Sequence, residues 1–497
     1  MREKERGRAD RGLRPQHALG RSPHDRGGGA PQQHNETHTT EPEPRRHDRA
    51  ARSETSTDKK PARELVGELT RGFAELAVEL PDDDHDGPIG WDGYGDARAA
   101  AGARTGERES VLCGTGRVGD TEAVLLAFEF GFLGGSVGRR TGLLIEAAFR
   151  HAVAHRLPIV SLIATGGSRM QEGTAALSQL HRMARASATT REAGIPQLAV
   201  LRDPTTGGGW ATIGAGADVT LALGGAQVGF AGSRVRDDGD THAYTAEGQF
   251  ETGHVDRVLA HGDLPAALRR WLALLTTSTS EPAEPPGALG RRELPETGWD
   301  AVERARAPER PRAEEYLDAY FDWREDISGD RRGGVDDGVR CGFGRRGGRT
   351  IGYAAQCGTA TTPAGYRTAA RLVRLADRLG IPVLTLVDTP GAANDPAAER
   401  AGIGAAIAEL FEAIAAAATP VTTLVIGEGG SGGALAFAAP GRTWITADGY
   451  LSVIGPEAAT AILKRERDDA PAIADQLRLR PQDLVELGIA EGVVEPD

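Results

Sequence analysis

The sequence predicts an α/β protein built from two similar halves. An apolar strand leads into a glycine-rich turn and a helix twice in each half, over residues 159–173 and 197–232, and again over 383–395 and 421–457. Strands that alternate with helices favour layered α/β architecture. The same order of segments on both sides of the chain indicates an internal duplication.

Composition excludes several classes of function. The chain has 497 residues, enough for two or three domains, and its net charge of −13 gives no global support for a nucleic-acid partner. No run approaches the ~18 apolar residues of a membrane span, and the first residues lack the apolar region of a secretory signal. Cys113, Cys341 and Cys357 are too far apart in sequence to form a CxxC pair, a disulfide framework or a zinc ribbon. We therefore expect a cytoplasmic protein with no metal and no membrane or nucleic-acid partner.

Local composition divides the chain into four parts. Residues 1–60 have almost no large apolar side chains, so we expect a disordered tail. Residues 61–275 form the predicted N-terminal domain, and residues 299–497 form the C-terminal domain. Between them, residues 276–298 are rich in Pro, Thr and Glu, which is typical of a linker.

The elements of the N-terminal half follow from its periodicity. Apolar residues at helical spacing predict a helix over 62–80. Two β-rich runs within 109–132 predict strands. Residues 134–157 predict a glycine turn that opens a helix.

The C-terminal half is predicted in the same way. Residues 314–323 indicate a short helix, and 341–357 indicate two strands around a glycine turn. An amphipathic pattern over 363–380 predicts a helix that ends at Gly380. The last predicted strand is 492–495.

The glycine turns are the candidate site. A glycine run before a helix frees backbone N–H groups and carries the partial positive charge of the helix N-terminus. Two such amides can hold an oxyanion, and the loss of one donor costs about 2.7–4 kcal/mol of transition-state stabilisation. The candidates are Gly166, Gly167, Gly207, Gly208 and Gly209 in the first half, and Gly429, Gly430, Gly432, Gly433 and Ala434 in the second. A single cluster would favour a purely structural role, whereas four matched clusters favour two oxyanion sites that act on two carbonyl compounds.

Other sites fit the sequence less well. No phosphate-binding GxxxxGK[ST] motif is present. Ser431 lies in GGSGG, close to a nucleophile elbow, but no histidine follows His261 to serve as its base. Asp388 and Glu428 end strands, where we expect them to cap helices or bind turn amides rather than act as acid–base groups.

Several motifs resemble one enzyme family. In the first half these are FGFLGGSVGRRTG, TGGSRMQEG, DPTTGGG and GFAGSRV, which resemble the beta subunit of the bacterial acetyl-CoA carboxylase carboxyltransferase. In the second half ARAPERPRAEEYLDAYF, PAGYRTAARLVRLAD, VDTPGA, GEGGSGGALAF and GPEAATAIL resemble its alpha subunit. The match runs from about residue 86 to the C-terminus, as if two usually separate chains were fused.

The resemblance implies a fold and a reaction. It implies two crotonase-like domains of ββα superhelical turns, the first binding acyl-CoA and the second, from a partner protomer, binding carboxybiotin. The carboxyl group would pass to acetyl-CoA or a related acyl-CoA, giving malonyl-CoA for fatty-acid or polyketide synthesis. The biotin carboxyl carrier protein and the biotin carboxylase would be other chains, because the sequence has no biotin-accepting Met-Lys pair and no ATP-grasp-like region. A homodimer or higher homo-oligomer with interface sites is expected.

The resemblance also implies roles for individual residues. The thioester enolate would be stabilised by Gly166 and Gly167, and the biotin ureido oxygen by Gly433 and Ala434. Acyl-CoA would be bound by Gly207, Gly208, Arg139 and Arg140, biotin by Gly429, Gly430 and Gly432, and the acyl pocket would be set by Leu435 and Ala436.

The sequence departs from the family pattern in places that bear on the substrate. It has no four-cysteine zinc ribbon, and it reads Gln356-Cys357-Gly358 where the family has a lysine-glycine pair. It also reads Gly455-Pro456-Glu457 and Gly232-Ser233-Arg234 at two other motifs. The identity of the acyl-CoA therefore stays open. The alternatives are a decarboxylase of malonyl-type thioesters on the same fold, a non-catalytic carboxylase-complex subunit, and a hydratase, for which Glu172 is a single carboxylate where a pair is needed.

Overall fold

The computed structural model describes residues 60–82, 84–236 and 239–496. The predicted disordered tail, residues 1–60, lies outside the described residues except for Lys60. Within these ranges no helix is both long enough and apolar enough to cross a membrane.

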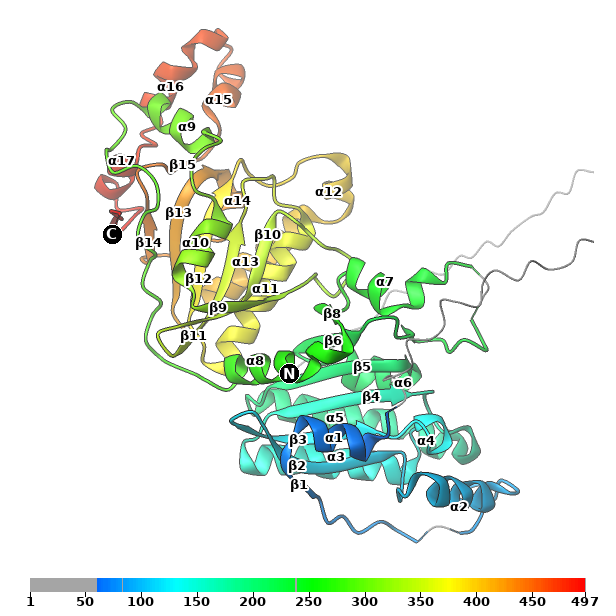
Figure 1. The fold of residues 1–497 in the computed structure, drawn as a ribbon. Helices are drawn as coiled ribbons and strands as arrows, with labels where there is room; N and C mark the ends of the chain where they lie inside the picture. The colour runs from blue at the N-terminus through cyan, green and yellow to red at the C-terminus, as the bar shows by residue number, and fades with distance from the viewer. Residues whose placement is uncertain (1–59, 83, 237–238, 497) are drawn as a thin grey trace, which may run out of the picture. The chain divides into compact units, whose positions relative to one another are not determined.

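The first half contains one eight-stranded sheet with the strand order β1-β2-β3-β4-β5-β6-β8, and β7 pairs with the end of β5 (Figure 1). Strands β1 to β3 pair antiparallel, whereas β3, β4, β5, β6 and β8 pair parallel. The strands are β1 (Arg71–Glu75), β2 (Val111–Val118), β3 (Thr121–Phe128), β4 (Ile159–Thr165), β5 (Gln197–Thr206), β6 (Val219–Leu223), β7 (Val228–Gly229) and β8 (Arg257–Leu259).

The second half repeats this topology strand for strand. Its sheet has the order β9-β10-β11-β12-β13-β14-β16, and β15 pairs with the end of β13. The strands are β9 (Trp323–Ile327), β10 (Val339–Arg346), β11 (Arg349–Gln356), β12 (Val383–Thr389), β13 (Val421–Gly430), β14 (Thr443–Ile445), β15 (Tyr450–Ser452) and β16 (Gly492–Val493). The duplication predicted from the sequence is therefore confirmed at the level of sheet topology.

Helices connect and cover both sheets. In the first half they are α1 (Ala62–Leu69), α2 (Tyr94–Thr105), α3 (Arg139–His155), α4 (Gly173–Leu177), α5 (Gln179–Glu192), α6 (Gly207–Gly209), α7 (Ala246–Glu251) and α8 (Leu264–Leu275). In the second half they are α9 (Gly298–Arg306), α10 (Ala313–Tyr320), α11 (Pro363–Leu379), α12 (Pro396–Arg400), α13 (Ile403–Ala416), α14 (Ser431–Leu435), α15 (Pro456–Ile462), α16 (Ala470–Gln476) and α17 (Pro481–Glu486).

The predicted helix over 62–80 is wrong beyond its first two turns. Helix α1 ends at Leu69, and β1 pairs with β2 from Arg71 onward. The residue after the helix, Thr70, is already extended with φ of −129°, and Gly72, inside β1, has a left-handed φ of +67° that a helix would not allow. Apolar residues further along this stretch pack on the core from an extended chain. Tertiary pairing has overridden a helical periodicity that is real in the sequence.

The other element predictions are confirmed. Helices α3 and α11 lie inside their predicted ranges, α10 begins one residue before its predicted range, and Gly380 ends α11 with φ of +67°. Strands β2, β3, β10, β11 and β16 also form where the sequence predicts them.

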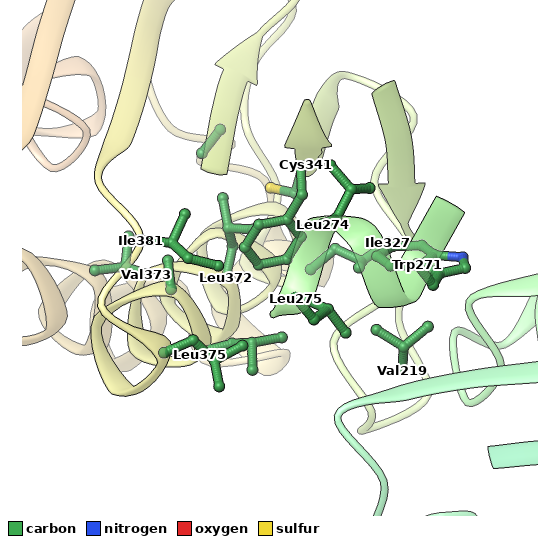
Figure 2. Close-up of a cluster of buried hydrophobic side chains, with 14 of the residues drawn as sticks. Val219, Trp271, Leu274, Leu275, Ile327, Cys341, Leu372, Val373, Leu375 and Ile381 are labelled. Atoms are coloured by element: carbon green, nitrogen blue, oxygen red, sulfur yellow. The ribbon is translucent and has the colours of Figure 1, made fainter. Parts of the chain in front are cut away.

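Helix α8 joins the two halves through a shared apolar cluster. Figure 2 shows Trp271 and Leu275 of α8 among Val219, Ile327 and Leu372, which come from both sheets and from α11. The Trp271 side chain is fully buried. Burial of such side chains stabilises each by roughly 1.5–3 kcal/mol, so this cluster fixes one half against the other.

Candidate active site

Each half ends a central strand in the same hydrogen-bonded turn. The N–H of Gly167 donates to Thr165 Oγ1 at the end of β4, over 3.1 Å. The N–H of Gly391 donates to Thr389 Oγ1 at the end of β12, also over 3.1 Å. In both halves the glycine donor lies two residues after the threonine acceptor. The duplication therefore extends to individual hydrogen bonds.

The first-half turn is fixed by a one-residue bridge to Val137. The Val137 N–H donates to Gly167 O, and the Arg169 N–H donates to Val137 O, each over 2.8 Å. In a parallel bridge the groups of the residues before and after the bridged residue, here Gly167 O and the Arg169 N–H, point toward the partner strand. The N–H of the bridged residue itself, Ser168, therefore points away from Val137. The turn therefore presents one outward-facing amide.

The second-half turn repeats this bridge with Thr361. The Thr361 N–H donates to Gly391 O over 3.1 Å, and the Ala393 N–H donates to Thr361 O over 2.9 Å. The N–H of Ala392 consequently points away from Thr361. Ala392 is thus the structural counterpart of Ser168.

A helix N-terminus lies beside each outward amide. In the second half, a Cβ added to Gly433 would overlap the backbone nitrogen of Ala392 and lie 2.6 Å from Tyr366 Oη. Gly432 and Gly433 belong to the first turn of α14, where helix geometry leaves N–H groups without an intrahelical acceptor. The outward amide of Ala392 and the first turn of α14 are therefore in direct contact.

In the first half the helix N-terminus approaches Gly167, the residue before Ser168, and it does so from the first position of α6. Gly207 has φ of +62°, and a Cβ there would lie 2.9 Å from Gly167 Cα. Gly208 and Gly209 follow it in the first turn of α6. Side chains larger than hydrogen would separate the two turns, so this contact requires glycine.

Some of the amides predicted as donors already have acceptors in the chain. The Gly166 N–H donates to Gly134 O over 2.9 Å, and the Gly167 N–H is bound to Thr165. Ala434 is the fourth residue of α14, and the carbonyl of the N-cap residue Gly430 accepts the first intrahelical bond from that position. The turns lie where the sequence predicts them, but the N–H groups of Gly166 and Gly167 already have acceptors within the chain.

Sequence reasoning missed Ser168 and Ala392. Each is the first residue after its glycine turn, in TGGS and in DTPGA. The matched positions of the two motifs were the only signal that could have found them. Their direction depends on Val137 and Thr361, which no local pattern reveals.

The carbonyl of Gly433 is held by two buried side chains. Tyr366 Oη donates to it over 3.1 Å, and Gln356 Nε2 donates over 3.3 Å. Gln356 Nε2 also donates to Thr361 Oγ1 over 3.0 Å. The peptides of this turn are therefore pre-positioned before any ligand binds.

Arg169, the residue after Ser168, anchors the first-half turn through a buried guanidinium group. The Arg169 guanidinium pairs with Glu109 over 2.6 Å and donates to Ser136 O over 2.7 Å. Both charged side chains are fully buried. Burial by itself raises the pKa of Glu109, but the charge and hydrogen bonds of Arg169 outweigh it and the net pKa is lowered.

Glu172 caps α3. Its carboxylate accepts the backbone N–H of Arg139 and the hydroxyl of Tyr94, the latter over 2.6 Å. Burial raises the pKa of Tyr94 to about 12. Glu172 is committed to structure, which removes the carboxylate that a hydratase would need.

Asp388 and Glu428 are also committed to structure, but mainly through ion pairs with arginines rather than the predicted helix capping or binding of turn amides. Asp388 pairs with Arg310 and Arg312 and accepts the Glu428 N–H over 3.2 Å. The Glu428 side chain accepts from Arg306 over 2.9 Å. Neither carboxylate is an uncommitted acid or base.

The remaining predicted site residues lie around the turns. Arg139 begins α3 with an exposed side chain, and Arg140 follows, half-buried. In α14 the Leu435 side chain is 45% exposed, whereas Ala436, which follows the helix, is buried. Ser431 is exposed with φ of +58°, at the strand-to-helix position that Gly207 occupies in the first half.

Comparison with known proteins adds the family. A model described as acetyl co-enzyme A carboxylase carboxyltransferase-like matches residues 294–497, and one described as carboxyl transferase domain matches residues 90–254. The chain is 40% identical over 454 residues to the acetyl-coenzyme A carboxylase carboxyl transferase subunits beta/alpha of Salinispora tropica, covering 85% of this chain and 79% of the relative. The chain belongs to the carboxyltransferase family of the biotin-dependent acyl-CoA carboxylases. Its members are enzymes, so the predicted enzyme class is confirmed.

Further relatives of this carboxyltransferase agree. A probable biotin-dependent acyl-coenzyme A carboxylase beta3 subunit of Mycobacterium tuberculosis is 34% identical over 414 residues, covering 81% of this chain and 83% of the relative. Among solved structures, transcarboxylase 12S aligns with a TM-score of 0.72 at 21% identity, covering 88% of this chain and 87% of that one. These neighbours confirm the predicted fold of two crotonase-like halves.

Proposed function

We propose that this carboxyltransferase moves a carboxyl group from carboxybiotin, attached to a separate carrier protein, to acetyl-CoA or a related acyl-CoA. The observation that carries the proposal is the duplicated pair of convergent amides, Ser168 with the first turn of α6 and Ala392 with the first turn of α14. Carboxyl transfer develops negative charge on two carbonyl oxygens, one in the thioester and one in the biotin ureido group. Two oxyanion sites match two oxygens.

The first-half site receives the thioester in this proposal. The N–H groups of Ser168, Gly208 and Gly209 surround the place where the enolate oxygen develops charge, with Gly166 and Gly167 forming the turn. Gly207 allows the close approach of the two turns. Arg139 and Arg140, at the start of α3, bind CoA phosphates.

The second-half site receives the biotin ring. The N–H groups of Ala392, Gly432 and Gly433 donate to the ureido oxygen, while Gly429 and Gly430 let β13 approach β15 and β12. Leu435 and Ala436 then border the acyl group. Residues 61–275 and 299–497 are the corresponding acyl-CoA and carboxybiotin domains.

The chain supplies positioning and electrostatic stabilisation rather than a base. Glu172 and Asp388, the carboxylates nearest in sequence to the two turns, are bound to α3 and to Arg310. The carbon–nitrogen bond to the carboxyl group breaks, a carbon–carbon bond forms at the acyl α-carbon, and the α-proton passes to the ureido nitrogen. The rate acceleration comes from holding both substrates close together in the orientation that the reaction needs.

We also propose that a second copy of the chain completes each site. Apolar side chains beside the turns are exposed: Met170 is 67% exposed, Phe230 is 72% exposed and Leu435 is 45% exposed. Exposed apolar side chains gathered near a site mark a surface that another chain covers. A homodimer or larger homo-oligomer brings the first half of one chain against the second half of its partner.

The test is reconstitution. The chain is mixed with biotinylated carrier protein, biotin carboxylase, ATP, bicarbonate and a panel of acyl-CoAs, and carboxylated thioester is measured. We expect product from acetyl-CoA or a near homologue, dependent on every component. Release of CO2 from malonyl-CoA with no carboxylation would favour the decarboxylase. No turnover in either direction would favour a non-catalytic subunit.

A further inference from the structure

A hollow of about 500 Å³ between the two halves is lined by arginines. Four of them lie on α11 at Arg367, Arg371, Arg374 and Arg378, a spacing that puts them on one helix face. Arg331 and Arg332 come from the loop before β10, and Arg191 comes from α5 of the first half. The hollow is separate from both pairs of convergent amides.

These arginines share their carboxylates, two arginines to one acid. Asp256 pairs with Arg331 and, over 2.9 Å, with Arg371. Asp218 pairs with Arg378 over 2.6 Å and lies 3.9 Å from Arg191.

At the outer rim one carboxylate is shared by two arginines and another is paired with one. Glu409 pairs with both Arg332 and Arg374, and Asp330 pairs with Arg367 over 2.7 Å. Glu412, with an exposed side chain, adds one more carboxylate at 3.7 Å from Arg374. The seven guanidinium groups therefore outnumber the carboxylates around them, in a chain whose net charge is −13.

The surplus charge is poorly compensated inside the hollow. Burial and the neighbouring charge of Arg371 lower the pKa of Arg331 to about 10. Within the described residues, Arg378 Nη1 is buried and has no hydrogen-bond partner. A buried donor without an acceptor costs roughly 1–3 kcal/mol, so pairing with Asp218 does not satisfy the whole Arg378 guanidinium.

We infer that this hollow is a binding site for the phosphate groups of a small anionic ligand, beyond the proposed carboxyl-transfer sites. Guanidinium groups bind phosphate oxygens through paired N–H donors. A cluster of arginines therefore matches a ligand with several phosphate oxygens better than an anion that carries one charge. Because the arginines come from both halves, an anion held here ties the halves together. A ligand that binds only the folded chain also raises its stability.

Inorganic pyrophosphate is the probe. Its binding to the full chain is measured by calorimetry at fixed ionic strength, and thermal unfolding is followed in parallel. We expect saturable binding and a higher unfolding temperature than with chloride at the same ionic strength. In Arg378→Gln the affinity should fall about tenfold or more, because the loss of a charge-assisted hydrogen bond is worth roughly that factor.

Two further variants keep the test decisive. Arg374→Gln changes a half-exposed side chain at the rim, so it should fold even where Arg378→Gln does not, and it should also weaken binding. Arg117→Gln removes the same charge from an exposed site on β2 and should bind pyrophosphate like wild type. Equal affinity in wild type and Arg374→Gln would overturn the inference, as would no stabilisation beyond that given by chloride.

The source of the phosphate and the independence of the site are tested together. Competition of CoA or of ATP with pyrophosphate identifies which phosphate-containing ligand binds in the hollow. Arg140→Gln, in the proposed acyl-CoA site, should leave pyrophosphate binding unchanged. A parallel loss in Arg140→Gln would place the pyrophosphate in the acyl-CoA site and overturn the inference, while leaving the proposed carboxyl transfer intact.

Discussion

Gly433 lies against the backbone nitrogen of Ala392, so close that any side chain at Gly433 would overlap it. Ala392 directs its N–H away from Thr361 and toward this point. Ala392 follows the end of β12 and Gly433 lies in α14, the helix after β13, so their contact joins a turn amide to a helix N-terminus.

Gly433→Ala should strongly reduce carboxyl transfer while leaving acyl-CoA binding intact. The added methyl group would displace Ala392 and Tyr366, removing at least one oxyanion donor, which costs about 2.7–4 kcal/mol. Turnover should fall about 10²–10³-fold in the reconstituted assay. Gly404→Ala on α13, where a Cβ meets nothing within 4 Å, is the matched control. Near-normal turnover in Gly433→Ala would exclude this turn from the site.

Ser168→Pro should remove the first-half donor, because proline has no N–H. We expect a loss of turnover similar to that of Gly433→Ala, measured with saturating carrier protein. Ser168→Ala keeps the amide and serves as the control, so it should remain close to wild type. If both variants lose activity equally, the hydroxyl and not the amide of Ser168 is the functional group.

Ser168→Pro and Ala392→Pro should complement each other when co-expressed. If each site joins the first half of one chain to the second half of its partner, a mixed dimer keeps one intact site. About one quarter of wild-type activity should return in a random mixture. Failure to recover activity, with mixed dimers demonstrated by differential tags, would place each site within a single chain.

Arg169→Met should destabilise the fold strongly. It leaves Glu109 buried without its partner, a change that typically costs 3–5 kcal/mol. Urea unfolding measures this loss, and Arg150→Met on the exposed face of α3 is the control. The double variant Arg169→Met with Glu109→Gln removes the stranded charge and should recover part of the stability. No recovery would mean that packing and not charge accounts for the loss.

The free energy of unfolding should decrease at low pH because Asp256 becomes protonated. Burial raises the pKa of this carboxyl, but Arg331 and Arg371 outweigh it, and the net pKa lies below the ordinary value of 3.8. A lowered folded-state pKa stabilises the fold above 3.8, and this contribution is lost as pH falls through the folded-state value. Asp256→Asn should be less stable at neutral pH and show a shallower loss of unfolding free energy below about pH 4. An unchanged slope would exclude Asp256 as a contributor.

The repeated order of strand, glycine turn and helix was sufficient to predict most elements and the duplication. Positions such as Gly380 and Gly207, which have positive φ, could be identified because few other residues tolerate that conformation. The conformation of the stretch after Leu69 could not be predicted, because its apolar residues fit a helix as well as a packed extended chain. Pairing of β1 with β2 decided between them.

The sequence by itself determined where the two glycine turns lie and that they are equivalent, because only glycine permits such close backbone approach. The tertiary structure alone decided which amides face outward. That direction depends on bridges from Ser168 to Val137 and from Ala392 to Thr361, residues distant along the chain. The N–H groups of Gly166 and Gly167 are bound to Gly134 and Thr165, whereas the N–H of Ser168 faces away from Val137.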